Sequence, residues 1–190
     1  NRDDPAGFFD PLLEPIKPMW VQGYTPARVE QIIQETPDTK TLVLQPSRRW
    51  PGFRAGQHVN ICIDVGGIRR NRSFSLSSSP ILWQEQGRAT LTIKRLPGGR
   101  VTNWIHDDLQ TGTVIGIGEA FGDFQIPEPA QPVLFIAGGS GISPVLSQLA
   151  TMAATNYRAP VTLLYFVRTA DDVIARETLQ ALAARYGALT

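Results

Sequence analysis

The sequence predicts two domains of different class: a six-stranded antiparallel β-barrel, followed by an α/β domain with an incomplete parallel sheet. Between residues 28 and 126, short alternating apolar and polar runs are separated by Gly and Pro, which is typical of antiparallel strands with one buried face. After Pro127, Pro129 and Pro132 the alternation gives way to an uninterrupted apolar run, as in buried parallel strands. We therefore expect a leader over residues 1–24, a barrel over 25–128 and an α/β domain over 131–190.

The leader contains four prolines and little periodicity, so it is interpreted as an extended linker. Its aromatic and aliphatic side chains, among them Phe8, Phe9 and Trp20, are too apolar for a purely solvated tail. We expect part of it to dock on the body of the protein or on a partner.

The barrel strands are predicted from alternation, most clearly where Val59, Ile61 and Ile63 point to one side and polar residues to the other. One helix, over residues 102–109, interrupts them, with Thr102 as its N-cap. The predicted strands cover residues 29–34, 41–44, 59–65, 72–77, 89–96 and 113–118, enough to close a small barrel.

In the second domain, a buried strand at 133–137 leads to a helix that opens at Ser143-Pro144, a good N-cap followed by Pro at the first helical position. A second strand at 161–167 and a helix at 172–186 continue the βαβα pattern. Two strands cannot bury both faces of a parallel sheet, so the sequence is expected to be a fragment or a cleaved chain.

Composition excludes several classes of protein. Cys62 is the only cysteine, and neither His58 nor His106 has a partner at ligand spacing, so we expect no metal site and no iron-sulfur cluster within the chain. No run approaches the ~20 apolar residues of a membrane span, and residues 1–10 lack the basic and apolar sections of a signal peptide, so a cytoplasmic location, or one peripheral to the inner face of a membrane, is expected. Nucleic-acid motifs are absent.

Charge is uneven along the chain despite a net charge of +1. Between Arg48 and Arg100 there are ten basic residues and two acidic ones, Asp64 and Glu85. Ordinary surface solvation explains part of this excess. The remainder indicates that the middle of the chain meets anions.

Three motifs carry the chemistry, and each also has a purely structural interpretation. Residues 72–80 form a strand that runs into a Ser-rich turn, which could be no more than a hydroxyl-rich barrel edge. Residues 97–104 place glycines before a helix N-terminus, where backbone N–H groups and the helix dipole hold phosphate, although a hairpin turn would read the same way. Residues 138–144 join a buried strand to a helix through three glycines, which favours a dinucleotide phosphate turn over a simple connection.

Together, and in this order, the three motifs resemble the ferredoxin reductase superfamily, from about Arg28 to the end of the chain. The family's Arg-x-Tyr-Ser motif matches Arg72 to Ser75, its flavin phosphate loop matches Gly98 to Thr102, and its Gly-Gly-x-Gly-Ile-Thr-Pro turn matches Gly138 to Pro144. The resemblance implies a Greek-key barrel that binds FAD and a domain that binds NADPH or NADH as hydride donor.

The resemblance also implies roles for individual residues. Arg72 would pair with the FAD pyrophosphate, Phe74 would replace the Tyr beside the flavin and lose its hydroxyl, and Ser75 would act catalytically at flavin N5. The expected cofactor-binding residues are Arg72, Ser73, Phe74, Ser75, Ile93, Lys94, Gly98, Gly99, Arg100, Val101, Thr102, Gly138, Gly139, Gly141, Ser143, Pro144 and Arg168.

Two further positions differ from the residues usual in the family. Ser143 stands where the family has Thr and keeps the hydroxyl, while Glu119 stands where Pro is usual, a change for which we have no interpretation. Arg168 follows the second strand and would favour NADPH by binding the 2'-phosphate, although pairing with Asp171, Asp172 or solvent explains it equally well.

The function implied by the resemblance is an NAD(P)H-dependent reductase that takes hydride onto FAD and passes electrons singly to a ferredoxin or iron-sulfur domain. Any 2Fe-2S cluster would belong to a missing domain or to a separate partner, and the final acceptor would be an oxygenase or a membrane desaturase. The alternatives are a truncated flavin-binding or interaction module without turnover, and a flavin-free scaffold with the same barrel.

Overall fold

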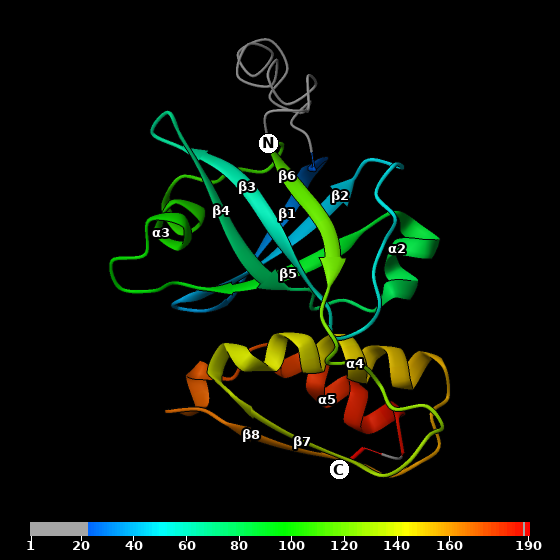
Figure 1. Ribbon diagram of the computed structural model, residues 1–190. Helices are drawn as coiled ribbons and strands as arrows, with labels where there is room; N and C mark the ends of the chain where they lie inside the picture. The colour runs from blue at the N-terminus through cyan, green and yellow to red at the C-terminus, as the bar shows by residue number, and fades with distance from the viewer. Residues whose placement is uncertain (1–22, 188) are drawn as a thin grey trace.

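The computed structural model describes residues 23–187, 189 and 190, so the predicted leader lies almost entirely outside the described residues. A six-stranded antiparallel sheet forms the first part of the chain, and a two-stranded parallel sheet with helices forms the second (Figure 1). The predicted fold class is thereby confirmed.

The first sheet has the order β4-β3-β6-β1-β2-β5, and every neighbouring pair in it is antiparallel. All six predicted strands are present, several of them longer than expected because the ladders continue beyond the alternating runs. They are β1 (Thr25–Thr36), β2 (Thr39–Pro46), β3 (His58–Val65), β4 (Ile68–Ser75), β5 (Ala89–Lys94) and β6 (Val114–Phe121).

The expectation of a closed barrel is wrong in one respect. The edge strands β4 and β5 form no ladder with each other, and the bridge between Leu76 and Leu91 joins them only just beyond the carboxyl end of β4. The sheet therefore curls into a barrel shape but stays open along β4, because that strand diverges from β5 towards Ile68. An open edge of this kind leaves backbone and side chains of β4 available to a ligand.

The inside of the curled sheet is the core that alternation predicted, with Val59, Ile61 and Ile63 among its buried side chains. Trp50, which is 2% exposed, closes one end and donates a 2.8 Å hydrogen bond from Nε1 to the Gly118 carbonyl oxygen. The core fixes the registers of β3 and β4, since a slip by one residue would turn the apolar side chains outward.

Two helices accompany this sheet, and only one of them was predicted. The unpredicted helix is α2 (Pro80–Gln86), which is capped by Ser79, has Pro80 in its first turn and ends at Gly87 in the left-handed region with φ 67°. The other is α3 (Arg100–Asp107), whose N-cap is Gly99. The assignment of Thr102 as N-cap was therefore wrong, because the helix begins two residues earlier.

In the second sheet, β7 (Val133–Gly138) and β8 (Val161–Phe166) run parallel, as predicted. Between them the chain forms a 3-10 turn, η1 (Gly139–Gly141), and then α4 (Ile142–Ala154), so Ser143 lies inside the first turn and is not the N-cap. The predicted last helix, α5 (Arg176–Arg185), begins four residues later than expected and is preceded by a 3-10 turn, η2 (Ala170–Asp172).

Helix α4 lies between the two sheets (Figure 1). Phe135 and Ala137 of β7 are buried in the same cluster as Val145 and Leu149 of α4. The other face of β7 and β8 is apolar and exposed, with Leu134, Ile136, Leu164 and Phe166 each at least 45% exposed. One face of the parallel sheet is thus packed and the other is open, as expected for an incomplete layer.

Within the described part of the chain, no helix is both long enough and apolar enough to cross a bilayer. In the same residues, no group of three or more His, Cys, Asp or Glu side chains is placed to hold a metal ion.

Candidate flavin and nicotinamide sites

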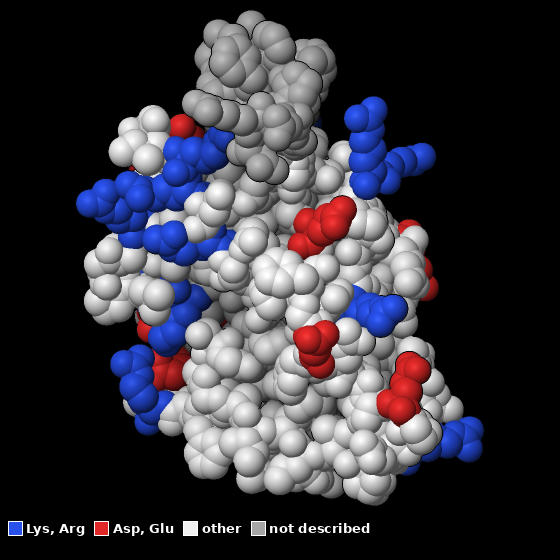
Figure 2. Space-filling model, in the orientation of Figure 1, with Lys and Arg blue, Asp and Glu red and all other residues white. Residues whose placement is uncertain are grey.

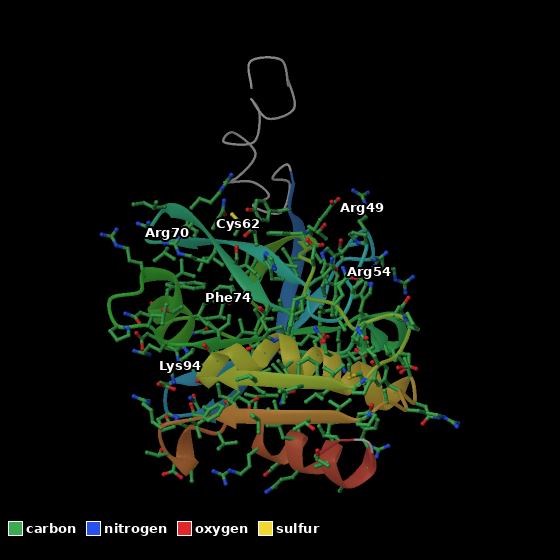
Figure 3. The ribbon with its side chains drawn as sticks, turned by 60° about the horizontal axis from the view of Figure 1, so that its bottom comes forward. Arg49, Arg54, Cys62, Arg70, Phe74 and Lys94 are labelled. Carbon is green, nitrogen blue, oxygen red and sulfur yellow. The ribbon has the colours of Figure 1, made fainter. Side chains whose placement is uncertain are left out.

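Strand β4 places its basic and aromatic residues on the core side of the sheet. In the ladder, Arg70, Arg72 and Phe74 lie opposite Ile63, Ile61 and Val59 of β3, which are all buried. Residues directly opposite each other share a face, so these three side chains line the inner face of the open edge. Figure 3 shows Arg70 and Phe74 along β4, with Phe74 nearer to α4.

The two predicted serines of this motif point to the other face of β4. The Ser73 hydroxyl donates a 2.5 Å hydrogen bond to Oδ1 of Asn60, so it already has a partner on the neighbouring strand. Ser75 pairs with His58 at the carboxyl end of β4, and its hydroxyl has no hydrogen-bond partner among the described residues. Ser75 is therefore the serine whose hydroxyl can bind a ligand at the end of the strand.

The serines that follow, in the Ser-rich turn, hold the protein together. The Ser77 hydroxyl lies 2.8 Å from Thr90 Oγ1 and 2.9 Å from Thr92 Oγ1, and Ser78 accepts a 3.0 Å hydrogen bond from the Thr90 backbone N–H. Ser79 Oγ caps α2 by accepting from the Ile81 N–H. For residues 77–79 the structural interpretation of the motif is therefore sufficient.

The loop before α3 has the geometry expected of a phosphate site. Gly98 adopts φ 71°, and a side chain on Gly99 would lie 2.4 Å from Thr102 Oγ1. That hydroxyl fastens the loop by accepting from the Leu96 N–H at 3.2 Å and donating to the Gly99 carbonyl oxygen at 3.3 Å. No side chain caps the first turn of α3, so its N–H groups and its positive dipole end are open to an anion.

Charge at this edge favours an anionic ligand. Figure 2 shows Lys and Arg gathered over the side of the molecule that carries β4 and α3. Among the described residues, no carboxylate lies within 4.0 Å of the guanidinium nitrogens of Arg70, Arg72 or Arg100. Within the described part of the chain, the one hydrogen bond from these three side chains is a 2.7 Å bond from Arg72 to the Asn71 carbonyl oxygen.

Two buried polar atoms on the same side lack partners. Arg70 Nε on β4 and Asn103 Oδ1 on α3 are both shielded from solvent, and neither has a hydrogen bond within the described residues. Buried polar groups are nearly always paired, so two unpaired buried atoms on neighbouring elements indicate that a polar ligand completes the site. The residues present therefore fit a large anionic cofactor such as FAD.

Two other predicted flavin-site residues are engaged elsewhere in the protein. Ile93 is 1% exposed in the core, and its carbonyl oxygen is 3.1 Å from His106 Nε2. Lys94 forms an ion pair with Asp38, with Nζ 2.7 Å from Oδ2. Burial raises the pKa of Asp38, but hydrogen bonds from Lys94, Thr36 and Thr39 outweigh it, and the net shift is downward. Contacts of Ile93 and Lys94 with a flavin remain predictions.

The glycine turn after β7 is the second candidate site. Gly139 has φ 49°, and added side chains on Gly138, Gly139 or Gly141 would meet nothing within 4 Å, so the turn borders open space at the carboxyl end of β7. The Tyr165 hydroxyl holds the turn by donating a 3.0 Å hydrogen bond to the Gly139 carbonyl oxygen, and burial raises the pKa of this phenol. The position is the one where open α/β sheets bind ligands.

Ser143 and Pro144, at the start of α4, belong partly to the contact between the domains. Ser143 is 3% exposed, and its Oγ lies 2.9 Å from the Ser140 carbonyl oxygen and 3.3 Å from the Thr92 carbonyl oxygen of β5. Its hydroxyl is thus directed towards the barrel. The predicted contact of Ser143 with a nucleotide pyrophosphate stays a prediction.

Arg168 sits among carboxylates. Its guanidinium is 3.1 Å from Asp172 Oδ1 and 3.6 Å from Asp38 Oδ2, with the side chain 74% exposed. Pairing with Asp172 was one of the two interpretations of this residue, and the structure contains that pair. Binding of a 2'-phosphate would have to compete with both carboxylates.

The contact between the domains was not predicted. On α4, the Ser147 hydroxyl donates a 2.6 Å hydrogen bond to the Ser78 carbonyl oxygen, and Gln148 Nε2 donates at 2.7 Å to the Phe124 carbonyl oxygen. The only sequence signal was the spacing of hydroxyl side chains four residues apart on α4, which helix geometry places in one row.

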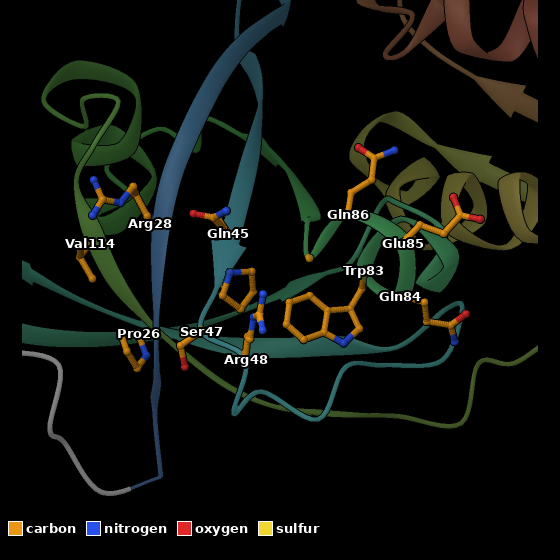
Figure 4. Close-up of a pocket in the computed structure, with 12 residues that line it drawn as sticks. Pro26, Arg28, Gln45, Ser47, Arg48, Trp83, Gln84, Glu85, Gln86 and Val114 are labelled. Carbon is orange, nitrogen blue, oxygen red and sulfur yellow. The ribbon is translucent and has the colours of Figure 1, made fainter.

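A hollow of about 770 Å³ lies elsewhere, between β1, β2 and α2. Trp83 and Arg48 face it (Figure 4), together with Arg28 and Gln45. None of the predicted site residues lines this hollow, so it is separate from both candidate sites.

Comparison with known proteins agrees with this division of the chain. The model of the oxidoreductase FAD-binding domain family matches residues 26–126, and that of the oxidoreductase NAD-binding domain family matches residues 135–190.

Among curated proteins, the glycine betaine monooxygenase reductase subunit of Pseudomonas aeruginosa is 35% identical over 170 residues, which is 87% of this chain and 45% of the relative. An NADPH oxidoreductase of Mycobacterium tuberculosis is 34% identical over 177 residues, 92% of this chain and 47% of the relative. The chain thus spans about half the length of these curated relatives.

Among solved structures, the flavohem-like FAD/NAD-binding domain of a nitric oxide dioxygenase from Vibrio cholerae superposes with a TM-score of 0.78 at 26% identity, covering 87% of this chain and 72% of that one. A ferredoxin-NADP+ reductase from Plasmodium falciparum, at 21% identity and a TM-score of 0.76, covers 88% of this chain and 71% of its own and shares the fold.

Proposed function

The chain belongs to the oxidoreductase family that joins an FAD-binding domain to an NAD-binding domain, and from this premise we propose that it binds FAD along β4 and α3 and accepts hydride from NAD(P)H. The observation that carries the proposal is the hydrogen bond from Ser147 to the Ser78 carbonyl oxygen. It links the helix after the nicotinamide turn to the barrel three residues beyond Ser75, which brings the two candidate sites together.

In this proposal the protein binds and orients, while FAD, when bound, supplies the redox chemistry. Arg72 would pair with the pyrophosphate, and the uncapped N–H groups at the start of α3 would hold it from the other side. Phe74, partly buried against the core, would offer an aromatic face without the hydroxyl usual in the family. Ser75 would donate a hydrogen bond at flavin N5, because its hydroxyl has no other partner in the described residues.

The nicotinamide donor would bind at the glycine turn, with its pyrophosphate in the open space beside Gly138, Gly139 and Gly141. Hydride transfer needs the reacting atoms within roughly 3 to 3.5 Å, so the fixed contact between α4 and the barrel matters for the rate. Arg168 would support NADPH only if the phosphate displaced its two carboxylates, so NADH and NADPH are both proposed as donors.

For the electron acceptor we propose an oxygenase system, reached through a ferredoxin or an iron-sulfur domain. The support comes from the functions of relatives, which include the glycine betaine monooxygenase reductase subunit and a toluate 1,2-dioxygenase electron transfer component from Pseudomonas putida, 31% identical over 133 residues. A membrane desaturase is the second candidate acceptor. A cytoplasmic location fits the single cysteine, since stabilising disulfides are rare in that compartment.

The test is anaerobic mixing of the FAD-loaded protein with NADH or NADPH while flavin bleaching is followed. Bleaching by either nucleotide supports a reductase, and comparison of the two rates identifies the donor. A protein that binds FAD but is not bleached by either would be the module without turnover, and a protein that takes up no flavin would be a scaffold.

Ser75→Ala tests the role at N5. It is expected to keep FAD but to slow its reduction by roughly 100- to 1,000-fold, the range for loss of one transition-state hydrogen-bond donor. Ser73→Ala is the matched control, because Ser73 already bonds to Asn60 on the outer face. Reduction of Ser75→Ala at the rate of Ser73→Ala would remove Ser75 from the mechanism.

A further inference from the structure

We propose that Arg70 and Asn103 bind the adenylate half of FAD and thereby select FAD over FMN. The inference rests on the proposed flavin site and deepens it by naming two further residues: Arg70, which lies outside the three motifs, and Asn103, which lies in the second motif but was not among the expected binding residues. Its starting point is the pair of buried polar atoms without partners, Arg70 Nε and Asn103 Oδ1.

Position along β4 separates Arg70 from the isoalloxazine end of the site. Ser75 ends the strand beside the second domain, Arg72 lies three residues earlier, and Arg70 lies two residues before Arg72 on the same face. Two residues of a strand span about 6.8 Å. A ligand with its ring at Ser75 and a phosphate at Arg72 would therefore place whatever lies beyond that phosphate beside Arg70.

Asn103 approaches the same region from the helix. It lies three residues after Arg100 in the first turn of α3, so both side chains share one face of that helix. Helix α3 contacts β3, the strand paired with β4. Figures 1 and 3 both show α3 beside the end of β4 that carries Arg70.

The chemistry of the two groups matches an adenylate. The Arg70 guanidinium only donates hydrogen bonds and carries a positive charge, so it requires an acceptor such as a phosphate oxygen. The Asn103 side-chain oxygen accepts, so it requires a donor such as a ribose hydroxyl or the adenine amino group. FMN ends at its single phosphate, which Arg72 and the α3 loop would already hold, and it offers nothing to fill the outer position.

The experiment is a flavin titration of the apo chain, with quenching of flavin fluorescence measured separately for FAD and FMN. The variants are Arg70→Met and Asn103→Leu, which keep much of the side-chain volume. Arg69→Met is the control, because it removes the same charge from the neighbouring residue on the opposite face of β4. Circular dichroism of each variant confirms that it is folded, and Arg70→Lys replaces Arg70→Met if that variant is not.

We expect Arg70→Met to weaken FAD binding by about 10- to 100-fold, as for loss of a hydrogen bond to a charged group, and to change FMN binding by less than about 2-fold. Asn103→Leu should act in the same direction, and Arg69→Met should leave the FAD to FMN ratio unchanged. Equal loss of FAD and FMN affinity in Arg70→Met, or unchanged FAD affinity in both variants, would overturn the inference. Failure of the unaltered chain to bind either flavin would instead refute the proposed function itself.

Discussion

Removal of one hydroxyl from α4 should loosen the contact between the two domains. Ser147 is fully buried, and its Oγ lies 2.6 Å from the Ser78 carbonyl oxygen of the barrel. In Ser147→Ala that carbonyl loses its partner in a buried place, which costs about 1–3 kcal/mol. Alanine is the better helix former by up to about 0.5 kcal/mol, so the net loss of stability should be about 1–2 kcal/mol.

The assay is urea unfolding followed by two signals. All tryptophans of the described residues, Trp50, Trp83 and Trp104, lie in the barrel part, so their fluorescence reports on the barrel, while far-ultraviolet circular dichroism also reports on α4 and α5. With a slope of about 2 kcal/mol per molar urea, in the middle of the usual range, the expected shift of the dichroism midpoint is about 0.5–1 M towards lower urea.

Thr155→Ala is the control for this prediction. Thr155 caps the other end of α4, is exposed, and bonds only within its own helix, to the Thr151 and Met152 carbonyl oxygens. Its removal should change stability by no more than about 0.5 kcal/mol. Equal midpoints for Ser147→Ala and Thr155→Ala would mean that the hydrogen bond to Ser78 does not hold the domains together.

Three further changes give expected outcomes. Gly99→Ala should destabilise the phosphate loop by about 1–3 kcal/mol and weaken FAD binding, because its side chain would lie 2.4 Å from Thr102 Oγ1; normal FAD affinity would contradict this. Gly141→Ala should leave the free energy of unfolding within about 0.5 kcal/mol of the parent, since its side chain meets nothing within 4 Å. It should nevertheless weaken nicotinamide nucleotide binding about 10-fold in a titration, and unchanged affinity would place the ligand elsewhere. Burial lowers the pKa of His106 below its ordinary value of about 6.5, so the unfolded chain binds more protons and the free energy of unfolding should fall as pH drops below about 6.5. Denaturant titrations at several pH values should show a smaller fall for His106→Gln. An equal dependence of unfolding free energy on pH in the two proteins would exclude this histidine as the cause.

Local patterns were sufficient for the elements themselves. Alternation at Val59, Ile61 and Ile63 specified both the strand and its buried face, because a period of two residues fits only an extended chain with one face in the core. The helix that sequence analysis missed, α2, also had its signals: Ser79 and Pro80 at the start and Gly87 at the end. Its seven residues are too few for a visible helical period.

Some features of the candidate site could likewise be predicted from sequence, and others could not. The two glycine-rich motifs could be recognised from sequence because glycine is the residue type that tolerates the positive φ found at Gly98 and Gly139. The ion pairs of Asp38 with Lys94 and Arg168 could not be predicted from sequence, since the three residues come from distant parts of the chain. The Lys94 pair depends on the pairing of β2 with β5, and the Arg168 pair depends on how the hairpin between β1 and β2 meets the second domain.

The amino-acid sequence by itself determined the strands, the helices other than α2, the positions of the glycine turns and the basic middle of the chain, because these depend on neighbours along the chain. Only the tertiary structure decided that the sheet stays open along β4, that Ser147 joins α4 to the barrel, and that Arg70 Nε and Asn103 Oδ1 are buried without partners. Such features arise from long-range packing, in which residues far apart in sequence compete for the same space and the same hydrogen bonds.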